Sequence, residues 1–269
     1  LVAESAAIPA EARVEIQRRL QCARDDHGAR ILIAIESGSR AWGFPSPDSD
    51  YDARFVYVLP LASYVSLKQP RDVIEQPIDG LFDLNGWGLR KALNLMLKGN
   101  PVICEWIRSP ILYAEEDGFR ARLENILSSV DERPAAQHHH ASLMKANYQR
   151  FIAGSEDVKL KKYFYSLRPA YALNWMWQNP KGKLPMRFED LRAGVDEPPA
   201  LKTLIDDLVL KKSETRELGT GPRIAALDTF IEGALEDADA RNYGRQPQPG
   251  ADLVNACETL FQTMAGLEQ

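Results

Sequence analysis

Two short apolar segments separated by a loop constrain the fold of this chain more than any other feature. The first, ARILIAIES at positions 29–37, is too densely aliphatic for a surface helix and stops at Gly38. The second, YDARFVYVLP at positions 51–60, is rich in β-branched and aromatic residues and stops at Pro60. Apolar runs of this length, bounded by glycine or proline, are typical of buried β-strands. We therefore expect a buried sheet early in the chain.

The pattern changes along the chain from mixed to helical. Residues 71–87 offer two further short strands around Gly80, and residues 88–101 place leucines at helical spacing before a Gly-Asn-Pro stop. Beyond Pro134 the apolar spacing is helical throughout. We therefore predict an α+β fold with two domains: residues 1–133 form a mixed sheet with flanking helices, and residues 134–269 form an all-α domain.

Composition and charge exclude several classes of protein. The chain has 269 residues and a formal net charge of −5, so it lacks the overall basic character of a duplex-binding protein. It contains no apolar run approaching the ~20 residues of a membrane helix, and its first residues do not resemble a signal peptide. Its three cysteines are widely spaced, which indicates free thiols in a reducing compartment. We expect a soluble cytoplasmic protein with no membrane partner; its oligomeric state does not follow from the sequence.

The loop between the two apolar segments has the residues of a phosphate-binding turn. Ser37, Gly38 and Ser39 follow the first predicted strand and open a short helix. Backbone N–H groups at such a turn point outward and attract anions. Ser39 adds a hydroxyl, and the guanidinium of Arg40 could either bind phosphate oxygens or brace the loop. Gly38, Ser39 and Arg40 are therefore candidate nucleotide-binding residues.

Carboxylates at alternate positions follow this turn. Asp50 and Asp52 are two residues apart in a predicted strand, so their side chains should project from the same face. Carboxylate oxygens next to a phosphate site suit Mg²⁺ or Mn²⁺, and two such ions can activate an attacking oxygen and stabilise a leaving pyrophosphate. Asp83 is our candidate for a third ligand, because we place it at a strand end before a helix. Asp79 is the alternative, but it precedes Gly80 and suits a hairpin turn; Asp48 suits loop structure.

The spacing of these residues resembles a known group of enzymes. Gly38-Ser39 and Asp50-Tyr51-Asp52 are separated by ten residues, as in the signature of the DNA polymerase β-like nucleotidyltransferase superfamily. The wording GSRAWGF, SPDSDYDARFVYV, DLNGWGLRKALNLMLKGNP and EWIRSPILY, with KKYFYSLRPAYAL, is similar to predicted nucleotidyltransferases found beside RNA ligases in RNA-repair gene clusters. The resemblance covers roughly Ile31 to Trp177. It implies a polymerase β-like palm, Mg²⁺ dependence, catalytic and metal-binding roles for Asp50, Asp52 and Asp83, and a helical substrate-binding region.

A second group of candidate residues lies in the helical part of the chain. The segment KLKKYFYSLRPAY interleaves basic and aromatic side chains, a pattern that suits phosphates and base faces. Lys161 and Arg168 are seven apart and should share a helix face, and Lys162 and Tyr165 are three apart. The alternative is a solvated cationic face over a buried core. The consecutive histidines at 138–140 point about 100° apart on a helix, so we expect no zinc site.

These features favour an enzyme that moves a nucleotidyl group from a nucleoside triphosphate to a hydroxyl. The acceptor could be an RNA end, a protein side chain or a small molecule. Two alternatives remain open: a regulatory module that binds nucleotide without turnover, and a nucleotidyltransferase that modifies a partner protein.

Overall fold

A computed structural model describes residues 8–216 and 218–267 of the chain. These residues divide into two compact units. The helical unit comprises Trp42–Ser49 and Arg133–Arg245, and the sheet unit comprises the other described residues.

The sheet unit is built on a five-stranded mixed sheet with the order β3-β4-β2-β1-β5. β1 pairs antiparallel with both β2 and β5, β4 pairs parallel with β2, and β3 pairs antiparallel with β4. The strands span Arg30–Glu36 (β1), Tyr51–Val58 (β2), Val73–Glu75 (β3), Phe82–Gly88 (β4) and Leu112–Glu115 (β5). The predicted α+β fold with a mixed sheet and flanking helices is therefore confirmed.

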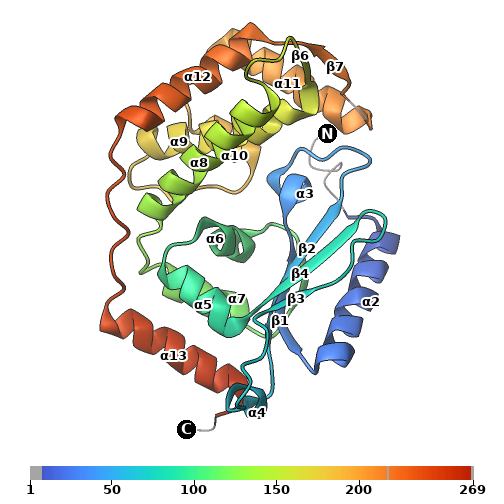
Figure 1. The fold of residues 1–269 in the computed structure, drawn as a ribbon, viewed down its shortest axis with the longest axis vertical. Helices are drawn as coiled ribbons and strands as arrows, with labels where there is room; N and C mark the ends of the chain where they lie inside the picture. The colour runs from blue at the N-terminus through green and yellow to red at the C-terminus, as the bar shows by residue number, and fades with distance from the viewer. Residues whose placement is uncertain (1–7, 217, 268–269) are drawn as a thin grey trace. The chain divides into compact units, whose positions relative to one another are not determined.

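Helices cover both faces of this sheet (Figure 1). On one face lies α2 (Ala10–His27), whose apolar side chains, including Ile16 and Leu20, pack in a core with Phe55 and Tyr57 of β2. The other face is covered by α5 (Leu89–Leu97), α6 (Pro101–Arg108), α7 (Phe119–Leu127) and α13 (Ala251–Ala265). The short helices α3 (Gly38–Trp42) and α4 (Leu61–Tyr64) follow β1 and β2. Since successive side chains of β1 and β2 enter opposite cores, both strands are apolar almost throughout, as the sequence predicted.

The helical unit is organised around α9 (Tyr163–Gln178), which is buried along most of its length and continues through Pro169. Tyr163, Phe164, Leu167 and Tyr171 of this helix fill its core. The other helices are α8 (Arg133–Phe151), η1 (Leu160–Lys162), α10 (Phe188–Ala193), α11 (Pro199–Glu214) and α12 (Ala225–Ala240). Two short strands, β6 (Asp157–Lys159) and β7 (Thr220–Pro222), pair antiparallel in this unit. This unit is helical as predicted, and the two short strands are an addition that helical spacing did not indicate.

The division into units also differs from the expected domains 1–133 and 134–269. The chain enters the helical unit at Arg133 but returns to the sheet unit at Gln246, so that α13 packs against α5 and α7 in a core of the sheet unit. The loop Trp42–Ser49 belongs to the helical unit. These assignments depend on contacts between residues that are distant in sequence, which helical periodicity does not report.

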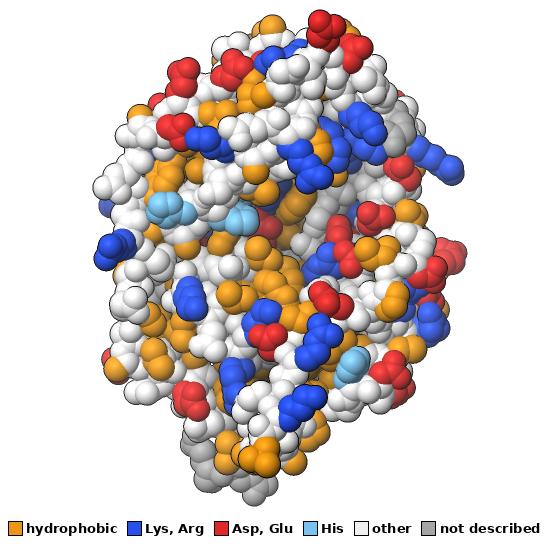
Figure 2. Space-filling model, in the orientation of Figure 1, with side chains coloured by type: hydrophobic (Ala, Val, Ile, Leu, Met, Phe, Trp, Pro, Cys, Tyr) orange, Lys and Arg blue, Asp and Glu red, His pale blue; other side chains and the backbone are white. Residues whose placement is uncertain are grey.

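Charged side chains of both signs are dispersed over the face drawn in Figure 2, as expected for a chain with a net charge of −5. No helix among the residues described is both long and apolar enough to cross a membrane.

Candidate active site

The turn between β1 and α3 brings Gly38 against Asp52. Gly38 has φ +59°, a left-handed conformation that favours glycine. A Cβ atom at this position would lie 1.9 Å from Oδ2 of Asp52, so only a glycine leaves room for that carboxylate. The backbone N–H of Ser37 donates to the carbonyl oxygen of Asp52 at 2.9 Å. The predicted Gly-Ser turn and the start of β2 therefore form one local structure.

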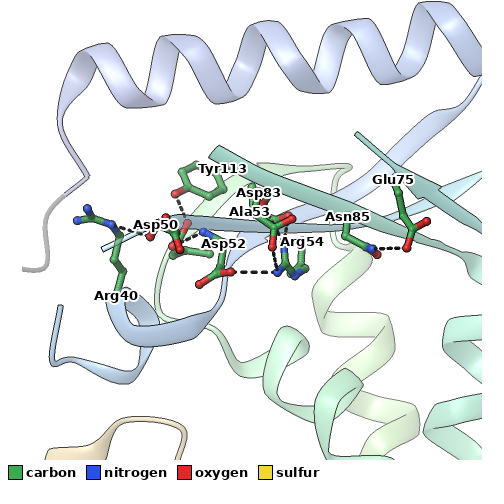
Figure 3. Close-up of polar contacts among 10 residues, drawn as sticks. Arg40, Asp50, Asp52, Ala53, Arg54, Glu75, Asp83, Asn85 and Tyr113 are labelled. Carbon is green, nitrogen blue, oxygen red and sulfur yellow. Dashed lines mark hydrogen bonds and ion pairs between the residues drawn. The ribbon is translucent and has the colours of Figure 1, made fainter. Parts of the chain in front are cut away.

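Two of the three predicted carboxylates are neighbours on parallel strands. Asp52 of β2 is in register with Asp83 of β4, and Nη2 of Arg54 lies 3.0 Å from Asp52 Oδ1 and 2.7 Å from Asp83 Oδ2 (Figure 3). Nη1 of Arg54 also donates to the carbonyl oxygens of Ala53 and Asp83. The side chains of Asp52 and Asp83 are 26 % and 31 % exposed, so both carboxylates can be reached from solvent. A single guanidinium thus holds the pair at an accessible position.

The reason given for choosing Asp83 was wrong, although the residue lies beside Asp52. We expected Asp83 at a strand end that leads directly into a helix. It is instead the second residue of β4, and α5 begins only at Leu89. The alternative, Asp79, lies in the turn before β4 and binds Nη2 of Arg19 at 2.9 Å.

Asp50 is placed less favourably than predicted. It precedes β2 rather than lying in it, and it is exposed. Its carbonyl oxygen accepts a hydrogen bond from Nε of Arg40 at 3.1 Å. Among the residues that the structure describes, no group of three or more His, Cys, Asp or Glu side chains is arranged to hold a metal ion.

The electrostatic state of Asp52 reflects this crowding. Burial raises the pKa of the Asp52 carboxyl above its usual range, and the nearby carboxylates of Asp83 and Asp50 raise it further. Arg54, and to a smaller extent Arg40, oppose the shift. The net shift is upward because burial and the two neighbouring carboxylates together outweigh the two arginines.

Glu36, which the sequence did not single out, supports this site by binding the backbone of Asp52. It ends β1 and is fully buried. Its Oε1 accepts the backbone N–H of Asp52 at 2.9 Å, and its Oε2 accepts the hydroxyl of Tyr113. Burial raises the pKa of Glu36 to about 7, while both hydrogen bonds act in the opposite direction. An acidic residue at the end of an otherwise apolar buried strand was the signal that could have revealed it.

Arg40 makes contacts within its own loop. It is only 6 % exposed, and its guanidinium carbon lies 4.0 Å from the ring centroid of Tyr51. Together with its bond to Asp50, this contact is consistent with the loop-bracing alternative, and phosphate binding by Arg40 stays a prediction.

The four candidates of the helical unit separate into two environments. Lys161 and Lys162 lie in η1, whereas Tyr165 and Arg168 lie in α9, so Lys161 and Arg168 do not share one helix as predicted. Arg168 is 5 % exposed, stacks on Trp42 at 4.3 Å and donates to the carbonyl oxygen of Met186. Lys162 lies 4.6 Å from the ring centroid of Tyr165, which is the proximity expected for that pair.

Comparison of the sequence with known families identifies one that covers most of the chain. The sequence profile of RlaP, the RNA repair pathway DNA polymerase beta family, matches residues 12–260. The chain is 41 % identical over 211 residues to the uncharacterized protein YcgL of Bacillus subtilis (strain 168), an alignment that covers 78 % of this chain and 80 % of that protein. A crystal structure of a nucleotidyltransferase-like protein from Exiguobacterium sibiricum aligns with 93 % of this chain and 77 % of its own. At 14 % identity and a TM-score of 0.30, that alignment carries no further argument.

Proposed function

Because this chain belongs to the RNA repair pathway DNA polymerase beta family, we propose that it transfers a nucleotidyl group from a nucleoside triphosphate to a hydroxyl, and that the hydroxyl belongs to an RNA end. The observation that carries this proposal is the pair Asp52 and Asp83, side by side on parallel strands next to the Gly38 turn. In nucleotidyl transfer, negative charge is concentrated on the phosphate oxygens. Carboxylates at a strand end can bind the cations that neutralise this charge.

The chemistry of the donor set suits a divalent cation such as Mg²⁺ or Mn²⁺. Asp50, Asp52 and Asp83 would hold it, since hard cations prefer carboxylate oxygens. The raised pKa of Asp52 is consistent with this assignment, because a bound cation would relieve the repulsion from the other two carboxylates. When bound, two such ions would stabilise charge on the attacking oxygen and on the leaving pyrophosphate.

The residues of the chain would contribute mainly by positioning. Arg54 holds the carboxylates of Asp52 and Asp83 in a fixed arrangement, and Glu36 fixes the backbone of Asp52. We assign Asp83 the further role of orienting or deprotonating the acceptor hydroxyl. In the step itself, the acceptor oxygen forms a bond to the α-phosphorus, the bond to the β-phosphate oxygen breaks, and pyrophosphate leaves.

We assign binding of the triphosphate to Gly38 and Ser39 of the turn; nucleotide binding by Lys161 and Lys162 of the helical unit stays a separate prediction. Arg40 and Arg168, which the sequence placed in the same group, both have guanidinium groups that contact aromatic rings within their own units. Their contribution to nucleotide binding is therefore expected to be indirect, through the loops and rings that they support.

The test is incubation of the protein with α-labelled nucleoside triphosphates, Mg²⁺ or Mn²⁺, and a panel of RNA ends and proteins. We expect label to appear on RNA with stoichiometric pyrophosphate release, and Asp52→Asn and Asp83→Asn to abolish both. Asp48→Asn, a carboxylate of the same loop to which we assign a structural role, is the matched control. Transfer that survives Asp52→Asn would contradict the proposal, and transfer to proteins alone would replace RNA as the acceptor.

One observation favours a second candidate, a regulatory module that binds nucleotide without turnover. Arg54 already neutralises Asp52 and Asp83, and the described residues contain no ready group of three metal ligands. Saturable nucleotide binding with no pyrophosphate release under any of these conditions would support that module.

A further inference from the structure

We propose that an aromatic and basic surface on the helical unit, formed by Phe151, Lys162 and Tyr165 with Arg150 beside them, binds single-stranded RNA. This inference rests on the proposed function, because it names the surface that would hold the RNA acceptor. We call these four residues the aromatic–basic patch.

The patch forms where the end of α8 meets the start of α9. The ring centroids of Phe151 and Tyr165 lie 6.4 Å apart with an interplanar angle of 56°. The ammonium group of Lys162 lies 4.4 Å from the centroid of Phe151 and 4.6 Å from that of Tyr165. The guanidinium carbon of Arg150 lies 5.0 Å from the centroid of Phe151. Two rings and two cations therefore occupy one small surface.

Tyr165 is the exposed ring of this surface, whereas Phe151 and Lys162 are half-buried. Tyr165 is 40 % exposed, in contrast to its neighbours Phe164 at 1 % and Tyr163 at 0 %, which point into the core. Nδ2 of Asn147 donates to the carbonyl oxygen of Tyr165 and so fixes the backbone that carries the exposed ring. On α8, Leu143 is also exposed, at 37 %, eight residues before Phe151. The exposed apolar surface is thus held in place by the two helices.

The chemistry of the patch matches a single strand better than a mononucleotide. Aromatic side chains stack on bases, and neighbouring cations meet the phosphates that link successive bases. Two rings inclined to each other offer separate faces, which successive bases of one strand could use. Segment 133–245 contains 18 Lys and Arg against 15 Asp and Glu, whereas the rest of the chain contains 15 against 23. A polyanion is therefore expected to prefer the helical unit.

The experiment measures binding of a fluorescein-labelled 12-nucleotide single-stranded RNA to the full chain by anisotropy, in EDTA and without nucleoside triphosphate. We expect saturable binding that Tyr165→Ala weakens roughly tenfold. Lys162→Ala should also weaken binding, and RNA binding by this variant should depend less on salt concentration than that of the wild type. Matched controls on the same unit are Leu210→Ala, which removes an apolar side chain that is 54 % exposed, and Lys202→Ala, which removes an exposed cation. The controls should bind like the wild type.

The outcomes separate this inference from the proposed function. Unchanged binding in Tyr165→Ala and Lys162→Ala, or weaker binding in the controls by the same factor, would overturn the patch. Wild-type binding of an acidic peptide but not of RNA would also overturn it, in favour of a protein partner. If RNA binds through the patch while no pyrophosphate is ever released, the patch stands and the proposed function fails. If transfer occurs but RNA does not bind in EDTA, the patch fails and the transferase stands.

Discussion

The charged groups singled out above are arranged differently in the two units of this protein. In the sheet unit, two carboxylates share one cation, Arg54, and stay partly exposed. In the helical unit, the cations Lys162, Arg168 and Lys212 lie over aromatic rings. In the sheet unit, this arrangement leaves carboxylate oxygens available to a further cation. In the helical unit, positive charge either contributes to packing or lies beside exposed ring faces. Under the function proposed above, the sheet unit would serve the transfer step and the helical unit would serve RNA binding.

The largest effect should come from removing the acidic pair. We expect the double variant Asp52→Asn/Asp83→Asn to lose at least about a hundredfold in transfer rate, because uncompensated transition-state charge is costly. It should still bind RNA in EDTA like the wild type. Initial rates and anisotropy, measured on the same preparations, check both statements. If the double variant also lost RNA binding, the proposed assignment of transfer to the sheet unit and RNA binding to the helical unit would be wrong.

Glu36 should give the sheet unit a characteristic dependence of stability on pH. Its pKa is raised from 4.5 to about 7, so between these values the folded state keeps a proton that the unfolded state releases. Stability from this group is therefore complete below pH 4.5 and is lost as pH rises to about 7, by a total of about 3 kcal/mol. Glu36→Gln should flatten the curve of unfolding free energy against pH in this window. Denaturant titrations at pH 4.5 and 7.5 test it, and parallel curves for the two proteins would contradict it.

Gly38→Ala should destabilise the turn by two separable effects. The left-handed backbone costs about 1 kcal/mol for alanine, and the overlap with the Asp52 carboxylate adds about 1–2 kcal/mol and displaces it. Gly28→Ala is the matched control, because Gly28 has φ +60° but no atom within 4 Å of its would-be Cβ. Thermal unfolding of both variants isolates the second effect. Equal melting temperatures would show that Asp52 moves aside without cost.

The smallest effect concerns a cation of the helical unit. Nζ of Lys212 donates to the carbonyl oxygen of Phe44 at 2.6 Å and lies 5.4 Å from the centroid of its ring. Lys212→Met keeps the apolar stem and removes this hydrogen bond, so we expect a loss of about 1 kcal/mol. Thermal unfolding, with the exposed Lys202→Met as control, measures it. A loss of transfer activity without a loss of stability would show that this cation has a role beyond packing.

The strands that carry the candidate site were predictable because their signals are local. Dense apolar segments ending at Gly38 and Pro60 defined β1 and β2 within one or two residues. The family spacing supplied Asp50 and Asp52, and two short strands around Gly80 were also correct.

The remaining features depend on contacts that local patterns do not encode. The parallel pairing of β2 with β4 sets Asp83 beside Asp52, and a strand sequence does not specify its partner or direction. The sequence did not single out Arg54, because its importance comes from an ion pair with Asp83 on the neighbouring strand β4. Glu36 is visible as an acidic end to an apolar strand, but its partner Tyr113 lies 77 residues away and cannot be read from that pattern. The periodicity of α13 predicted a helix correctly but said nothing of which core it joins.

The path of the chain through the sheet unit has a consequence for how this protein can vary. Nε2 of Gln246 donates to the carbonyl oxygen of Asp131, so the backbone departs for the helical segment and comes back at almost the same place. Because its two ends lie close together, the helical segment can become longer or shorter, or be exchanged, without changing the register of the strands. It also means that the core of the sheet unit is completed only after the whole helical segment has been synthesised, because α13 follows that segment in the chain.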